Sequence, residues 1–234
     1  MTTDKTRIWL GVCIMLGLAF IGVMLPTAVA KLKSYDRIVT VKGLCEKEVN
    51  ADQVIWPIVC KVAGNDLSQA YRELERQQQT IREFLVKGGV SDSEITPGAV
   101  EVSDQNTESY ATDRKMRYIL KGVITVCSKD IDKVRGLVAT QSQLVEKGIV
   151  TADDWENRIQ YSFESLNDIK PAMVEEATKN AREVAEKFAQ DSDSRLGKIK
   201  TASQGTFTIY DRDSNTPWIK EVRVVNSVTY YIVD

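Results

Sequence analysis

Histidine is absent from the 234-residue chain, and its absence removes several kinds of chemistry at once. Histidine is the usual general base near neutral pH and the commonest zinc ligand. The sequence also lacks the glycine-rich phosphate and dinucleotide loops, the serine nucleophile elbow and the His-Glu-x-x-His zinc helix. These absences exclude the enzyme designs that depend on those motifs. We therefore expect no catalytic residue, no organic cofactor and no metal ion.

An excess of basic residues is also missing. Lysine and arginine number 31 against 33 aspartates and glutamates, which gives a formal net charge of −2 at neutral pH. A protein that binds nucleic acid normally presents a basic field to the phosphate backbone. We therefore expect no nucleic-acid partner.

Cysteines are few and do not occur in Cys-x-x-Cys spacing. Cys13 lies in a hydrophobic segment, so Cys45, Cys60 and Cys127 remain, an odd number that cannot pair completely. A hairpin that turns near Asn50 to Gln53 would place Cys45 opposite Cys60, which makes this pair a candidate disulfide. The alternative is that both are buried free cysteines, the commoner state of a cysteine in an apolar strand.

Charge is absent from the 23 residues between Ile8 and Ala30. As a helix rising about 1.5 Å per residue, this run would span about 35 Å, more than the hydrocarbon core of a bilayer. We expect residues 1–30 to be a retained membrane anchor. The alternative is a cleaved secretory signal, with Lys5 before the run and a small-x-small site near Ala30, which would leave a soluble periplasmic protein. Either interpretation places the rest of the chain outside the cytoplasmic membrane.

The remaining residues, 37–234, alternate between strand and helix periodicity and predict one α+β domain. We expect about seven strands in an antiparallel or mixed sheet, packed with about three helices. The predicted strands include 37–48, 53–63, 114–128, 159–163, 197–210 and 219–233. The predicted helices run from an Asn65 or Asp66 cap to Gly88-Gly89, from Asp130 to Lys147, and from Asp168 to Gln190. Alanines at every fourth position from 177 to 189 indicate that the last helix packs closely on a sheet.

Adjacent carboxylates and exposed aromatic residues are the remaining candidates for a site. Asp153-Asp154 and Glu175-Glu176 are weak catalytic candidates, because neighbouring residues on one element point in different directions. Trp155, Trp218 or Tyr110 would be needed to line a small-ligand or peptide site. Lys198 and Lys200 are interpreted as solvated side chains, which leaves only the aromatic residues as a basis for a binding site.

Two features predict self-association. Pro57 cannot donate a hydrogen bond to a strand ladder, so its strand should lie at a sheet edge or carry a bulge, and a free edge has to be covered. The closing strand, 219–233, is apolar on both faces, which is typical of a strand between two layers. We therefore expect a homo-oligomer whose interface includes Pro57, Trp218 and Tyr231.

Several short segments match one known family in order and spacing. They are Val39–Gly43, Ala51-Asp52, Gly89-Val90 with Ile95-Thr96, Asp130–Lys133, Ile159–Phe163, Ala177–Ala189 and Leu196–Ile199. On these segments the chain, from Arg37 to Val233, resembles the SIMPL domain family of YggE-like bacterial envelope proteins. The resemblance implies an exported, self-associating protein on the outer side of the cytoplasmic membrane, with a role linked to envelope or oxidative stress. One departure is Ala51 before Asp52, where the family often has proline.

Three functional hypotheses follow from these patterns. The first is a non-catalytic, membrane-anchored oligomer that serves as a structural or interaction module. The second is a periplasmic module that binds a small ligand or peptide in a concave site. The third is a hydrolase or redox enzyme, which would need a thiol of lowered pKa at Cys45, Cys60 or Cys127.

Overall fold

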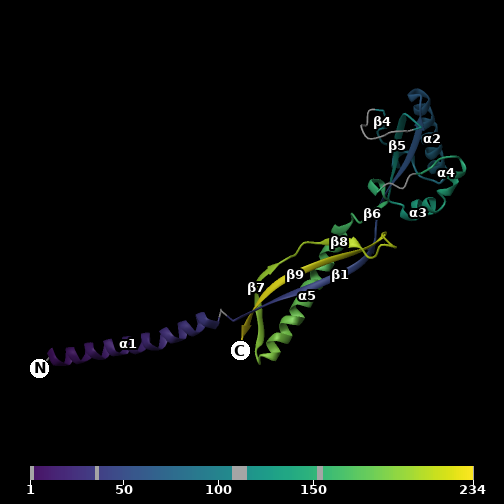
Figure 1. The fold of residues 1–234 in the computed structure, drawn as a ribbon. Coiled ribbons are helices and arrows are strands. Elements are labelled where there is room, and N and C mark those ends of the chain that lie inside the picture. The colour runs from purple at the N-terminus through teal and green to yellow at the C-terminus, as the bar shows by residue number, and fades with distance from the viewer. Residues whose placement is uncertain (1–2, 35–36, 107–114, 152–154, 234) are drawn as a thin grey trace. The chain divides into compact units, whose positions relative to one another are not determined.

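The computed structural model describes residues 3–34, 37–106, 115–151 and 155–233 (Figure 1). The chain divides into two compact units, although the sequence predicted one domain. Unit 1 contains Met1–Lys47, Ile169–Thr208 and Arg223–Asp234. Unit 2 contains Glu48–Asp168 and Ile209–Val222. The chain therefore passes between the units four times, and each unit is assembled from segments that are distant in the sequence.

The N-terminal helix α1 (Thr3–Ser34) contains the uncharged run and includes Pro26. Within the described ranges, no helix combines the length and the hydropathy that crossing a membrane requires. The membrane span expected from the sequence is therefore not confirmed.

Unit 1 contains helix α1, most of helix α5 (Leu166–Asp191) and most of a four-stranded sheet. The strand order of this sheet is β1 (Ile38–Asn50), β9 (Ile219–Val233) and β7 (Arg195–Ser203), and β8 (Thr208–Asp211) also pairs with β9. Helix α5 buries the four alanines from Ala177 to Ala189, and Ala181 and Ala185 form a core with Val41, Val228 and Tyr230. A methyl group added at Gly43 of β1 would lie 1.8 Å from the carbonyl oxygen of Ala177. The close helix–sheet packing predicted from the alanine spacing is confirmed.

The predicted strand 197–210 is two strands in the structure. The pairing of β7 with β9 shifts register between Leu196 and Thr201, which marks a β-bulge or irregularity. Farther along, a side chain at Gly205 would place its Cβ 2.1 Å from the carbonyl oxygen of Val225. The chain approaches β9 too closely there for any residue except glycine, so β7 ends before β8 begins.

Unit 2 contains a five-stranded antiparallel sheet with helix α2 (Leu67–Lys87) on one face. The order is β3 (Ile95–Pro97), β5 (Tyr118–Ser128), β2 (Gln53–Gly64) and β6 (Gln160–Ser162), with β4 (Glu101–Asp104) also paired to β5. Short 3-10 helices follow at Asp92–Glu94 and Trp155–Asn157. Buried leucines and isoleucines of α2 pack on the inward residues of β2 and β5, as the period-two pattern predicted.

Local end signals set the helices of this unit. The side chain of Asp66 accepts a hydrogen bond from the backbone of Gln69 and caps α2, and Gly89, just beyond its end, has φ 85°. The predicted helix 130–147 is instead α3 (Ile131–Ala139) and α4 (Ser142–Glu146). The Thr140 hydroxyl donates to the carbonyl oxygens of Gly136 and Leu137, at the point where α3 ends. The prediction of one continuous helix was therefore wrong.

The predicted hairpin of residues 37–48 and 53–63 is also wrong. Strand β2 pairs with β5 and β6, whereas β1 belongs to the other sheet. Backbone hydrogen bonds from Ala51 to Trp218 and from Asp52 to Ser162 hold the turn to other segments. Cys45 and Cys60 are free cysteines on strands of different sheets, so the candidate disulfide is not formed.

Pro57 lies where the structure leaves one side of β2 open. Strand β6 pairs only with Gln53–Ile55, and an isolated bridge joins Cys60 to Thr151. Between these points no described strand pairs with the outer side of β2, which fits a residue without an amide hydrogen. In β9 only one face is fully buried, while Val225 and Tyr231 on the other are half-buried. Strand β2 itself lies between β5 and β6, so the edge expected for the strand of Pro57 is found only locally, and full burial of both faces of β9 is not found.

Candidate functional site

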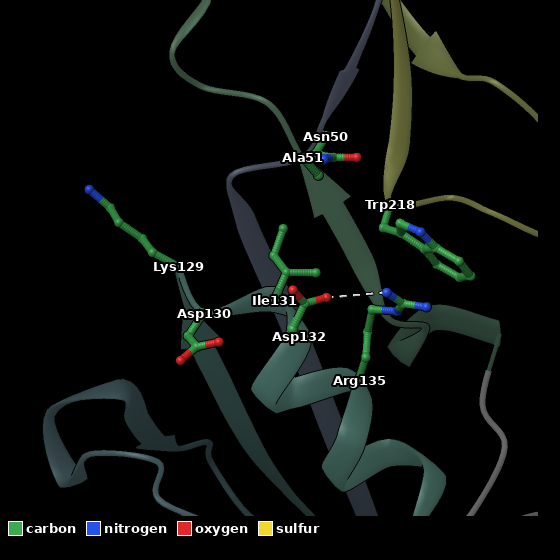
Figure 2. Close-up of a pocket in the computed structure, with 8 residues that line it drawn as sticks. All are labelled: Asn50, Ala51, Lys129, Asp130, Ile131, Asp132, Arg135 and Trp218. Carbon is green, nitrogen blue, oxygen red and sulfur yellow. Dashed lines mark hydrogen bonds and ion pairs between the residues drawn. The ribbon is translucent and has the colours of Figure 1, made fainter.

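A polar cleft of about 650 Å³ opens in unit 2 at the start of α3 (Figure 2). The end of β1, the first turn of α3 and the residue before β9 form its walls. The lining residues are Asn50, Ala51, Lys129, Asp130, Ile131, Asp132, Arg135 and Trp218. Three segments that are distant in the sequence thus meet at one site inside one unit.

The central contact of the cleft joins Arg135 to Trp218. The guanidinium carbon lies 3.7 Å from the centroid of the indole ring, a cation–π geometry. Nη1 of Arg135 lies 3.3 Å from Oδ1 of Asp132, and Figure 2 shows this ion pair beside the indole. The ring of Tyr161 meets Trp218 edge-on, with centroids 6.2 Å apart. Trp218 is therefore half-buried by neighbours within its own unit.

Asp130 forms the other side of the cleft and caps α3. One of its carboxylate oxygens accepts a hydrogen bond from the backbone nitrogen of Lys133 at 3.1 Å, and the other lies 3.0 Å from Nζ of the same lysine. The Lys133 side chain and backbone together hold the pKa of Asp130 below its usual value. Lys129 extends away from Arg135 (Figure 2). Two cations and two carboxylates line the cleft, so its formal charge is balanced.

Asp52, next to the cleft residue Ala51, fixes the adjoining loop. Its carboxylate accepts hydrogen bonds from the backbone nitrogens of Glu164 at 2.7 Å and Ser165 at 2.8 Å, directly before α5 begins. Burial alone would raise the pKa of Asp52, but the hydrogen bonds from Ser165 and Glu164 outweigh it and hold the pKa below its ordinary value. Asp52 is thus an ionised acceptor that fixes the segment leading into α5.

The chemistry available to the cleft is recognition of polar groups. Its lining offers a guanidinium, an ammonium, two carboxylates, an amide and an indole, but no hydroxyl or thiol nucleophile. Across the described ranges, no group of three or more His, Cys, Asp or Glu residues is arranged to hold a metal ion. The cleft can therefore present an ion pair and an aromatic face to a peptide or another protein surface.

Comparison with protein families gives one match. The SIMPL family, described as a protein of unknown function (DUF541), matches residues 39–227. The chain belongs to the SIMPL family. No curated protein is similar enough to the chain to be reported as a relative. The matched range covers all of unit 2 and part of unit 1, so the SIMPL match includes the cleft residues from Asn50 to Trp218.

The cysteines of this SIMPL chain differ in environment. Burial raises the pKa of Cys45 to about 11, helped by a hydrogen bond to Glu176 at 3.3 Å and by the charge of that carboxylate. Burial also raises the pKa of Cys60. Both thiols stay protonated near neutral pH, the opposite of what a nucleophilic cysteine requires. Cys127 is exposed and accepts a hydrogen bond from Nε2 of Gln53 at 3.1 Å.

The other described residues that were singled out from the sequence do not line the cleft. Trp155 is 76 % exposed and stacks on Arg158, whose guanidinium carbon lies 3.9 Å from the ring centroid. Glu176 faces Cys45, while Glu175 lines a different groove of unit 1, so the two carboxylates do not act together. Tyr110 and Asp153-Asp154 lie outside the described residues.

Of the three predicted interface residues, Pro57 and Trp218 belong to unit 2 and Tyr231 to unit 1. Pro57 lies on the open side of β2, and Trp218 is stacked in the cleft. Tyr231 is half-buried in unit 1, with Nζ of Lys200 5.5 Å from its ring centroid. Sequence reasoning identified Trp218 as an exposed aromatic but missed Arg135 and Asp132, because nothing in the local pattern of α3 predicts which residues meet the indole.

Proposed function

We propose that this SIMPL protein is a non-catalytic interaction module that self-associates outside the cytoplasmic membrane. The observation that carries this proposal is a partly exposed apolar surface on the second face of the sheet in unit 2. Helix α2 packs on one face, where Val54, Trp56 and Ile58 are buried. Because side chains alternate along a strand, the intervening residues of β2 lie on the opposite face.

That opposite face carries apolar side chains on neighbouring strands. Direct pairing places Pro57 beside Thr125 and Ala63 beside Ile119, so these residues share the face. Ile119 is 37 % exposed, and Ile55 and Pro57 are half-buried, whereas Val59 on the same face is 2 % exposed. An apolar sheet face of this kind is typical of a surface that a second protein covers. A second copy of the chain supplies such a cover by symmetry.

The test is the assembly state of the full chain in non-ionic detergent. We expect an oligomer by light scattering, and Ile119→Lys should shift it toward monomer because the substitution places a charge in the apolar face. Tyr71→Lys is the matched control, since Tyr71 is an exposed apolar residue of α2, away from that face. A wild-type monomer, or equal dissociation by both variants, would contradict the proposal.

The membrane anchor is a separate part of the proposal. It is supported by the 23 uncharged residues between Ile8 and Ala30. We expect the intact protein to keep residues 1–30 and to stay with membranes at alkaline pH. An intact mass that begins at Lys31 would show that the segment is a cleaved signal. The expected link to envelope or oxidative stress rests on the family resemblance and is tested by the growth of a deletion strain under each stress.

The cleft beside Trp218 favours a second candidate function, the capture of a peptide or small polar ligand. Binding should change the fluorescence of Trp218, because any ligand in the cleft lies against the indole or displaces Arg135. A panel of charged peptides titrated into wild type and Trp218→Phe tests this candidate. A fluorescence change that persists in the variant would assign the signal to another tryptophan and refute binding at the cleft.

A further inference from the structure

A second cleft, of about 610 Å³, lies in unit 1 between helix α5 and strand β7. Lys179 and Arg182 line it from the helix, and Lys198 and Ile199 line it from the strand. Tyr230 of β9 also lines it from within the core, where it packs on Ala181 and Ala185. We name this cleft the α5–β7 groove. Nothing in the self-association proposal involves it.

Tyr230 brings a hydroxyl group to the groove. The residue is 3 % exposed, yet among the described residues no hydrogen bond involves its hydroxyl. Burial raises the pKa of Tyr230, while the charge of Arg182 lowers it and that of Glu186 raises it. The Tyr230 oxygen is not fully enclosed, so the hydroxyl reaches the groove, where a bound acceptor can receive its hydrogen bond.

Positive charge surrounds this hydroxyl. Lys179 and Lys198 form no ion pair with any described residue, and both line the groove. Arg182 contacts Glu186 through Nε at 2.9 Å, so its terminal nitrogens are not used in that pair. Glu175 is the one acid among the lining residues. Three cations against one carboxylate give the lining a net positive charge that favours an anion.

The irregular pairing of β7 positions the strand side of the groove. Register shifts on both sides of Ile199 interrupt the ladder with β9, and such irregularities turn side chains away from the regular strand direction. A side chain at Gly197 would place its Cβ 2.9 Å from the carbonyl oxygen of Tyr231, so glycine permits this close approach. Ile199 remains half exposed beside the cations and offers an apolar contact.

We propose that the α5–β7 groove binds the phosphate group of a phosphate-bearing ligand. Two ammonium groups, one guanidinium and one phenol supply hydrogen-bond donors from both walls of the groove. A carboxylate has only two oxygens to accept from these donors, whereas a phosphate has three or four. The apolar part of the ligand lies against Ile199. The same chemistry is offered by a soluble organic phosphate and by the headgroup of an anionic phospholipid.

The experiment uses the full chain in non-ionic detergent at low ionic strength, with binding followed by ³¹P NMR line broadening. The probes are inorganic phosphate, glycerol phosphate, and mixed micelles containing either phosphatidylglycerol or phosphatidylcholine. Binding of the soluble phosphates alone assigns a soluble ligand. Binding of phosphatidylglycerol but not of phosphatidylcholine or the soluble phosphates assigns a headgroup. Absence of binding by every probe overturns the proposal.

Three variants localise the binding. Tyr230→Phe should weaken it about tenfold or more, the loss typical of a hydrogen bond to a charged group, while thermal stability without phosphate stays the same or rises. Lys198→Gln should weaken binding without affecting the fold, since Lys198 is exposed. Lys200→Gln is the control, because Lys200 lies over Tyr231 and does not line the groove. Equal weakening by Lys198→Gln and Lys200→Gln, or unchanged affinity in Tyr230→Phe, would refute the site.

Discussion

Asp52 is expected to stabilise helix α5 across 112 residues of sequence. Replacing it with alanine leaves the backbone nitrogens of Glu164 and Ser165 without their acceptor, at 2.7 and 2.8 Å in the native protein. A hydrogen bond to a charged group typically contributes about 1.5 to 3 kcal/mol, and Asp52 is only partly buried. We therefore expect Asp52→Ala to lower the free energy of unfolding by about 2 kcal/mol at neutral pH.

The effect should depend on pH in a defined direction. The pKa of Asp52 is lowered in the folded protein, so its contribution is fully present above the pKa of the unfolded chain, about 4, and is lost as the pH falls through the folded value. The difference between wild type and Asp52→Ala should therefore shrink in acid. Asp52→Asn keeps one acceptor oxygen and should lose part of the stability without the pH dependence.

Urea denaturation of the full chain in detergent, followed by circular dichroism, measures these differences. Hydrogen exchange of the Glu164 and Ser165 amides reports these hydrogen bonds directly and should accelerate in Asp52→Ala. The control is Asp132→Ala, whose side chain is 93 % exposed and whose loss should change stability by no more than about 0.5 kcal/mol. An Asp52→Ala protein as stable as wild type at neutral pH, or a stability difference that does not vary with pH, would refute the reasoning.

Two further predictions concern the packing of α5 and the cysteines. Gly43→Ala should destabilise the protein by more than about 2 kcal/mol in the same denaturation assay, since the added carbon would lie 1.8 Å from the Ala177 carbonyl oxygen. Gly136→Ala is the control and should be neutral or stabilising by up to about 1 kcal/mol, because Gly136 lies in helix α3 and the added carbon would meet no atom within 4 Å. Equal effects of the two substitutions would contradict the close packing of Gly43 against α5. Iodoacetamide should label the exposed Cys127 in the native protein and leave Cys45 unlabelled until urea unfolds the chain. Rapid labelling of Cys45 in the native protein would contradict the buried position described for this thiol.

Local signals predicted the elements well where a single segment carries the whole signal. Asp66 accepts from an amide three residues ahead, and Gly89 adopts a positive φ, so both ends of α2 are decided within a few residues. The buried alternation of β2 was predicted for the same reason. The division of helix 130–147 was missed, although Thr140 was visible in the sequence, because whether a hydroxyl bonds to the preceding turn depends on where the helix is already ending.

Strand partners were decided by the tertiary structure. The alternation of 37–48 and 53–63 is compatible with a hairpin, yet β2 pairs with β5, and β1 belongs to the sheet of β9. Alternation shows which face of a strand is buried but does not specify the neighbouring strand. The cleft was unpredictable for a related reason. Arg135 and Trp218 are more than 80 residues apart, and their contact depends on tertiary interactions such as the hydrogen bond from Ala51 to the Trp218 carbonyl.

The sequence by itself determined the α+β composition, the tight alanine face of α5 and the membership in the SIMPL family, because each depends on the kinds of residues and their order along the chain. The structure alone decided that the described chain forms two units and that Lys198, expected to be merely solvated, lines a cationic groove with Tyr230. The physical reason is that a side chain's charge and hydrogen-bonding capacity are read from its type, whereas its partners are set by which distant backbones pack together. In the SIMPL chain those contacts arise from a bulged strand, a glycine pressed against a helix and a carboxylate that fixes the segment leading into a remote helix.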